Sequence, residues 1–155
     1  MKTKTIALTL TMLFAAVLVC FAAGDVNMGT WKLNEAKSKI AAGNGKNVTV
    51  VYAMAGDSVK VTVDGVDGSG KPAHNEWTGK FDGKDYPVTG DPDNDMRSYK
   101  RVNDHTLSLI DKKGGKVTIT GRVEVSADGK SRTVTTSSTD AKGNKTSSTQ
   151  VYDKQ

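Results

Sequence analysis

From residue 47 onward, apolar and polar residues alternate in short runs. Within each run the apolar side chains recur at a spacing of two or four, which places them on one face of an extended strand. Valine and threonine dominate, as is typical of strands with a half-buried surface. The runs are Val48/Val50/Tyr52, Val59/Val61/Val63, Trp77/Phe81, Leu107/Leu109, Val117/Ile119/Val123/Val125 and Val134/Thr136. The pattern predicts antiparallel strands.

Clusters of Gly, Asn and Asp separate these runs, at residues 55–57, 67–70, 82–83, 113–115, 128–129 and 142–144. Such residues supply the positive φ that tight hairpins require. The only helical pattern spans residues 34–40, with Asn34 as a candidate N-cap, and predicts a short helix of about two turns after the first strand. No repeat of strand and helix and no second domain is indicated.

Closure of the strands into a barrel is expected from their number and from the small apolar content. About nine strands follow Gly29, whereas only about 30% of residues 25–155 are apolar. Closing the sheet removes both edges, and a barrel of this size tolerates a partly polar interior because it can enclose a ligand cavity. We therefore predict an all-β fold: an antiparallel up-and-down barrel of about eight to ten strands over residues 25–155.

The first 24 residues have the pattern of a signal peptide. Lys2 and Lys4 precede an apolar run over residues 6–21, and small residues follow, which allows cleavage before Ala23 or before Asp25. The alternative, a retained anchor, is disfavoured because the run is shorter than the ~20 residues needed to cross a bilayer. We expect a periplasmic or secreted protein with no membrane span after cleavage.

Cys20 raises the alternative of lipoprotein anchoring. Val19 stands where lipidated cysteines normally follow Gly, Ala or Ser, and the bulky Phe21 comes next, so Cys20 is interpreted as part of the discarded segment. Residues 25–155 then contain no cysteine, which excludes thiol chemistry and disulfides. Their net charge is +3, with basic residues scattered singly, so no nucleic-acid partner is expected.

Two segments carry a resemblance to a known family. Gly29-Thr30-Trp31, a G-x-W at the start of the first strand, resembles the calycin superfamily of lipocalins and fatty-acid-binding proteins. The resemblance implies that Trp31 plugs the closed end of the barrel. Residues 149–154 are similar to the closing strand of fatty-acid-binding proteins, which implies that Gln150 and Tyr152 hold a ligand's head group. The alternative is that the two residues belong to the exposed end of the last hairpin.

The middle of the chain departs from both families. Only residues 34–46 separate the first two predicted strands, which leaves no room for the helix-turn-helix lid of fatty-acid-binding proteins. Lys32 also differs from the residue types that the lipocalin signature expects after its tryptophan. Taken with residues 31–39 and 82–92, the chain most resembles small exported lipocalin-like proteins of bacteria, most of them uncharacterised.

A candidate ligand-binding wall lies at residues 97–101. Arg97, Tyr99 and Arg101 share one face of a strand. If this face points outward, it is ordinary cationic surface; if it points inward, it forms a wall that receives a carboxylate or phosphate. Because unpaired buried arginines are costly, the inward arrangement requires acidic or ligand partners. Trp77, with Phe81, is either core or a ligand-stacking residue.

The remaining chemistry is sparse. Residues 91–95 begin like a calcium loop, but Met96 and Val102 stand at the positions that need Gly and Glu, so a solvated hairpin loop is the better interpretation. His74 with Glu76 could form an acid/base pair on one side of a strand. No nucleophile elbow or phosphate-binding loop is present, and no histidine after His105 could ligate haem. We expect no enzyme activity, no cofactor and no metal.

These observations lead to two hypotheses of function. The first is an exported, monomeric, lipocalin-like barrel that binds a small hydrophobic or amphipathic molecule non-covalently. Trp77, Arg97, Tyr99, Gln150 and Tyr152 are its candidate ligand-binding residues, and Trp31 is its plug. The alternative is a structural or interaction module of the cell envelope, with a filled barrel and no ligand cavity.

Overall fold

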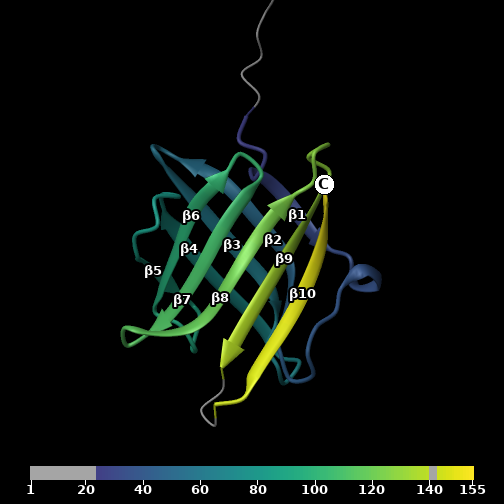
Figure 1. The fold of residues 1–155 in the computed structure, drawn as a ribbon, viewed down its shortest axis with the longest axis vertical. Helices are drawn as coiled ribbons and strands as arrows, with labels where there is room; N and C mark the ends of the chain where they lie inside the picture. The colour runs from purple at the N-terminus through teal and green to yellow at the C-terminus, as the bar shows by residue number, and fades with distance from the viewer. Residues whose placement is uncertain (1–23, 140–142) are drawn as a thin grey trace, which may run out of the picture.

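A computed structural model describes residues 24–139 and 143–155, and Figure 1 shows their fold. Ten strands form one closed antiparallel barrel in which each strand pairs with its neighbours in sequence. The elements are β1 (Gly29–Leu33), η1 (Glu35–Lys37), β2 (Lys46–Ala55), β3 (Ser58–Val66), β4 (Pro72–Gly79), β5 (Tyr86–Thr89), β6 (Met96–Asn103), β7 (Thr106–Lys113), β8 (Lys116–Val125), β9 (Ser131–Thr139) and β10 (Lys145–Lys154). The predicted all-β barrel is confirmed.

The first strand closes the barrel. β1 pairs with β2 through Trp31 opposite Val50, and with β10 through Trp31 opposite Lys154 and Leu33 opposite Tyr152. Among the described strands no edge is therefore left without a partner. Closure removes the unpaired edges that an open sheet of ten strands would expose.

The predicted two-turn helix is wrong in length, because the structure forms a single 3₁₀ turn over Glu35–Lys37. Asn34 does act as the N-cap: its side chain accepts a hydrogen bond from the Lys37 backbone N–H at 3.2 Å. The turn ends because Lys39 pairs with Thr149 of β10 through two backbone hydrogen bonds of 2.7 Å. This pairing holds the chain extended where the sequence pattern would continue the helix.

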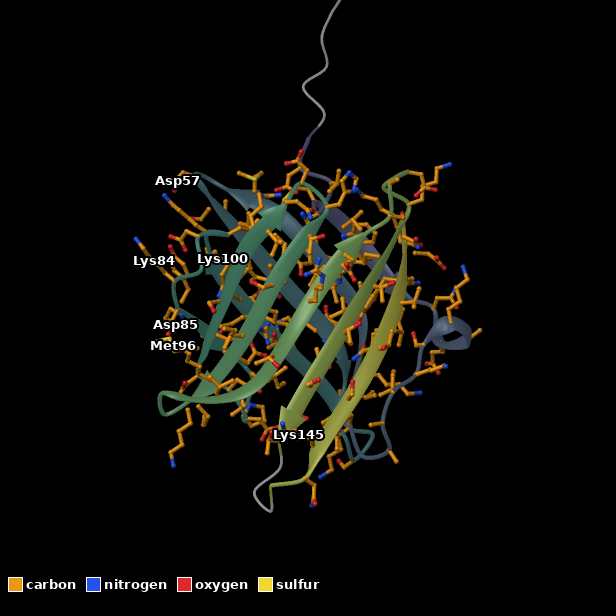
Figure 2. The ribbon with its side chains drawn as sticks, viewed as in Figure 1. Asp57, Lys84, Asp85, Met96, Lys100 and Lys145 are labelled. Carbon is orange, nitrogen blue, oxygen red and sulfur yellow. The ribbon has the colours of Figure 1, made fainter. Side chains whose placement is uncertain are left out.

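The two ends of the barrel differ. Up-and-down connectivity gathers the connections at residues 34–45, 67–71, 90–95 and 114–115 at one end, which we call the mouth. Figure 1 marks the C-terminus at the other, closed end. Trp31 lies at this end, because β1 pairs it with Lys154, next to the C-terminus. Figure 2 places Asp57, in the β2–β3 turn, at the closed end and Lys145, which begins β10, toward the mouth.

Residues 1–23 lie outside the described residues. The predicted signal peptide, both candidate cleavage sites and Cys20 fall there, apart from Gly24 and Asp25. Localisation therefore stays a prediction. Within 24–139 and 143–155, no helix is long and apolar enough to span a membrane.

Candidate functional site

The barrel contains a cavity of about 690 Å³. It extends from the mouth into the barrel as far as Tyr52, Tyr99 and Tyr152. Apolar side chains from five strands contribute to its wall: Val50, Val63, Leu109, Ile119, Val123 and Val134. Polar and charged side chains line the rest, among them Asn75, Asp91, Asn94, Asp111, Thr118, Arg132, Ser148 and Gln150. Cavities that bind small molecules commonly combine apolar walls with a few convergent polar groups, as this one does.

Arg97 points into the barrel, so the outward arrangement that the sequence left open is wrong. Its guanidinium is only 7% exposed and meets Asp111 in two hydrogen bonds, Nε to Oδ1 at 2.7 Å and Nη2 to Oδ2 at 3.1 Å. Asn75 accepts a further bond from Nη1 at 3.2 Å, and Asp91 lies 3.6 Å from Nη2. The acidic partners that the inward arrangement requires come from the protein itself.

Electrostatics fixes the charge of this group. Burial works against the charged guanidinium, but the facing Tyr99, Asp111 and Asp91 outweigh it, and they raise the pKa of Arg97 above its ordinary value. Arg97 is thus permanently charged, and its carboxylate partners neutralise it within the wall. A ligand anion would have to compete with Asp111 for the same donors.

Arg101 does not join this wall. It lies near the closed end, pairs with Asp25, and stacks its guanidinium 5.2 Å from the centre of the Phe81 ring. Asp25 also accepts hydrogen bonds from the backbone and side chain of Asn27 at 3.0 and 2.8 Å. The predicted wall of two guanidiniums therefore contains one, because Arg101 ties the N-terminal segment to β6.

Trp77 is a core residue and not part of the cavity lining. Its indole is 1% exposed and donates from Nε1 to the Arg97 backbone carbonyl at 2.9 Å. The ring meets Tyr99 and Tyr86 edge-on at 4.9 and 5.8 Å, and stacks on Phe81 at 6.4 Å. Its predicted contact with ligand does not agree with this position. Trp77 packs against Tyr99, which itself lines the cavity.

Tyr99 lines the cavity together with Tyr52. The Tyr52 hydroxyl donates to the Tyr99 hydroxyl at 3.4 Å, and the two rings meet edge-on with their centres 6.2 Å apart. Burial and the neighbouring Tyr52 raise the pKa of Tyr99 well above its ordinary value, against an opposing effect of Arg97. The phenol stays neutral at ordinary pH and presents a hydroxyl to the cavity.

Gln150 and Tyr152 lie side by side on β10, both buried and both in the lining. The Tyr152 hydroxyl donates to Gln150 Oε1 at 2.9 Å, and the same oxygen accepts the Asn47 backbone N–H at 3.2 Å. Burial raises the pKa of Tyr152, although Arg132 opposes the rise. The structure therefore brings this pair together inside the cavity, with the amide oxygen already occupied.

Arg132 is the cavity residue that sequence reasoning missed. It stands on β9 opposite Tyr152 of β10 and Val125 of β8, and is 2% exposed. A signal was present, because Val134 and Thr136 follow at a spacing of two and both line the cavity. Extending their phase back by two positions places Arg132 on the inner face.

The closed end is built around Trp31. The ring is fully buried and its Nε1 donates to the Asn27 backbone carbonyl at 2.9 Å. Cations lie over the ring from two strands: Arg132 of β9 and Lys154 of β10 each lie 5.0 Å from its centre. Lys154 also donates to the Val26 carbonyl at 3.2 Å. Trp31 is therefore buried at the closed end, and the plug role that the resemblance implies stays a prediction.

Two other groups of residues were candidates for a site: the His74–Glu76 pair and the loop at residues 91–95. The first lies outside the cavity lining, and the carboxylate that begins the second is hydrogen-bonded to its own loop. His74 Nδ1 is 2.6 Å from Asp64 and its Nε2 is 3.8 Å from Glu76, with the imidazole about half exposed and no part in the lining. In the loop at 91–95, the Asp91 carboxylate accepts the backbone N–H groups of Asp93 and Asn94. Within the described residues, no group of three or more His, Cys, Asp or Glu is placed to hold a metal.

Comparison with known proteins adds little to this picture. No protein-family model matches the chain, and neither does any curated protein sequence. A solved structure described as EF1p2_mFAP2b bound to DFHBI is similar at 9% sequence identity and a TM-score of 0.47. The match covers 84% of this chain and 94% of that one.

Proposed function

We propose that this protein is an exported, lipocalin-like carrier that binds a small amphipathic molecule non-covalently inside its barrel. The observation that carries the proposal is the cavity of about 690 Å³. A barrel that served only as an interaction module would be filled by its own side chains, as this one is not. The G-x-W at Trp31 and the Gln150–Tyr152 pair support the lipocalin-like assignment.

The composition of the wall defines the class of ligand. Six aliphatic side chains provide apolar surface, and burial of a ligand's apolar body against them supplies most of the affinity. Hydroxyl, amide and charged groups line the rest of the wall, and a pure hydrocarbon would leave the Arg132 donors Nε and Nη1, which have no partner among the described residues, unpaired. A molecule with both an apolar body and polar groups satisfies both parts of the wall.

Non-covalent binding, and not catalysis, is the activity proposed. The acid/base pair that the sequence suggested, His74 with Glu76, lies half exposed outside the lining. Export rests on the N-terminal pattern of Lys2, Lys4 and the apolar run over residues 6–21.

The test is a titration with N-phenylnaphthylamine, a neutral probe that fluoresces when it leaves water. Thr136 lines the cavity, so a larger side chain at this position would take up cavity volume, whereas Thr135 is exposed on the same strand. We expect saturable binding to the full chain, a loss of at least about tenfold in affinity for Thr136→Phe, and no change for the matched control Thr135→Phe. Absence of binding to the unaltered protein, or equal loss in both variants, would refute the proposal.

A further inference from the structure

Arg132 is a buried cation to which the described residues offer no acidic partner. Its side chain lines the cavity at 2% exposure, and neither Nε nor Nη1 has a hydrogen-bond partner. No ion pair joins it to a carboxylate within 24–139 and 143–155. Buried polar groups without partners are rare in native structures and call for an explanation.

The surrounding rings account for only part of its environment. The guanidinium carbon lies 5.0, 4.9 and 4.6 Å from the ring centres of Trp31, Tyr52 and Tyr152. Such contacts stabilise the charge through the faces of the rings. They do not satisfy the N–H groups, because those donate in the plane of the guanidinium.

The two tyrosines whose rings cover Arg132 direct their hydroxyl hydrogens to other residues. Tyr152, opposite Arg132, donates its hydroxyl hydrogen to Gln150, whose oxygen also accepts the Asn47 N–H. Tyr52 directs its hydroxyl to Tyr99. The two tyrosine oxygens keep acceptor capacity, but neither is a hydrogen-bond partner of Arg132 Nε or Nη1, so these donors are left for an acceptor from outside the described residues.

We propose that the ligand is an organic anion whose acid group, a carboxylate or another oxyanion such as a sulfonate, is received by Arg132. This inference rests on the proposed function and names the ligand class. The charged end then lies at the closed end of the barrel, among Tyr52 and Tyr152, and the apolar body lies along Val50, Val123 and Val134 toward the mouth. Arg97 does not compete for the anion, because Asp111 already holds its guanidinium.

The experiment compares two probes that share an aromatic skeleton, anilinonaphthalene sulfonate and N-phenylnaphthylamine, of which only the first carries a charge. Both are titrated into the full chain and into Arg132→Gln, with Arg132→Lys as the variant that keeps the charge. We expect the unaltered protein to prefer the anion, and Arg132→Gln to lose about 10- to 100-fold in affinity for it, as for a hydrogen bond to a charged group. Its affinity for the neutral probe should change less than about threefold, and Arg132→Lys should keep much of the preference.

The outcomes separate this inference from the proposed function. If the neutral probe binds but the unaltered protein shows no preference for the anion, the inference is wrong and the carrier function stands. If Arg132→Gln binds the anion as tightly as the unaltered protein, Arg132 serves only to close the barrel. If neither probe binds the unaltered protein, the carrier function itself fails. The comparison of probes on the unaltered chain remains decisive even if Arg132→Gln does not fold.

Discussion

Two arginines are buried in the same barrel, and they differ in whether the protein supplies hydrogen-bond acceptors for their side chains. Arg97, on β6, is enclosed by Asp111, Asn75 and Asp91, so its charge and its donors are satisfied within the wall. Arg132, on β9, is covered by three aromatic rings and has donors without acceptors. Both sit in the lining of one cavity.

This difference suggests that Arg97 stabilises the fold, whereas Arg132 is the residue that we propose binds a ligand. A buried ion pair contributes when both partners are present, but removing one partner leaves an uncompensated charge. Arg97 is therefore coupled to the stability of the β6–β7 wall. Arg132 has no such partner to lose, and in our proposal its unpaired donors receive the acid group of a ligand. The three predictions that follow test this contrast.

The largest effect is expected for Asp111→Ala. Removing this carboxylate leaves Arg97 charged and buried, with Asn75 and the more distant Asp91 as its remaining partners. We expect the free energy of unfolding to fall by about 3–5 kcal/mol, measured by urea denaturation. Asp57→Asn, which removes the exposed partner of Lys80, is the control and should leave stability almost unchanged. A similar small effect in both variants would contradict the structural role of Arg97.

An intermediate effect on the free energy of unfolding is expected at alkaline pH. Because the pKa values of Tyr99 and Tyr152 are raised in the folded protein, the unfolded chain loses these protons first as pH rises above about 10. Their contribution is thus complete below pH 10 and is lost as pH rises toward the folded-state pKa values. Each buried tyrosine should steepen the loss by about 1.4 kcal/mol per pH unit.

Tyr152→Phe checks the contribution at the closed end. Denaturation of this variant and of the unaltered protein across the alkaline range should show a shallower loss in the variant. The difference between the two curves isolates Tyr152 from the lysines that also titrate there. Parallel curves would show that Tyr152 ionises as easily in the folded protein as in the unfolded chain.

The smallest effect on stability is expected for Arg132→Met. Methionine keeps most of the apolar contact with the rings and removes a charge that has no acidic partner, so the lost cation–π contacts are offset. We expect the free energy of unfolding to change by less than about 1 kcal/mol, measured by the same urea denaturation. A loss comparable to that of Asp111→Ala would show that Arg132 is as structural as Arg97.

The fold was accessible from sequence because alternation and turn residues are local signals. The spacing-two runs and the glycine-containing turns located most strands, and the shortage of apolar residues indicated a closed barrel. β5, with four residues, and the early end of the turn after Asn34 were not accessible in this way. Lys39 is held extended by Thr149, more than a hundred positions away, and no local pattern contains that contact.

The site was predicted less completely, since it depends on which face each strand turns inward. Gln150 and Tyr152 were found through a resemblance, and Arg97 was named without its orientation. Asp111 fixes that orientation. It lies opposite Arg97 because of the register between β6 and β7, and this register cannot be read from the sequence. Arg132 was missed because a single arginine among serines and threonines looks like solvated surface. Its spacing of two from Val134, and of four from Thr136, is the pattern that predicts an inward side chain for Arg132.

The most direct test of the account is to observe the two arginines together while a ligand binds. In the NMR spectrum of the full chain, the Nε–H signals of Arg97 and Arg132 report on the acceptors of each side chain. On saturation with anilinonaphthalene sulfonate, the Arg132 signal should shift strongly and the Arg97 signal should stay, whereas N-phenylnaphthylamine should leave the Arg132 signal nearly in place. An Arg132 signal that does not respond to the bound anion, or that responds equally to both probes, would contradict the account.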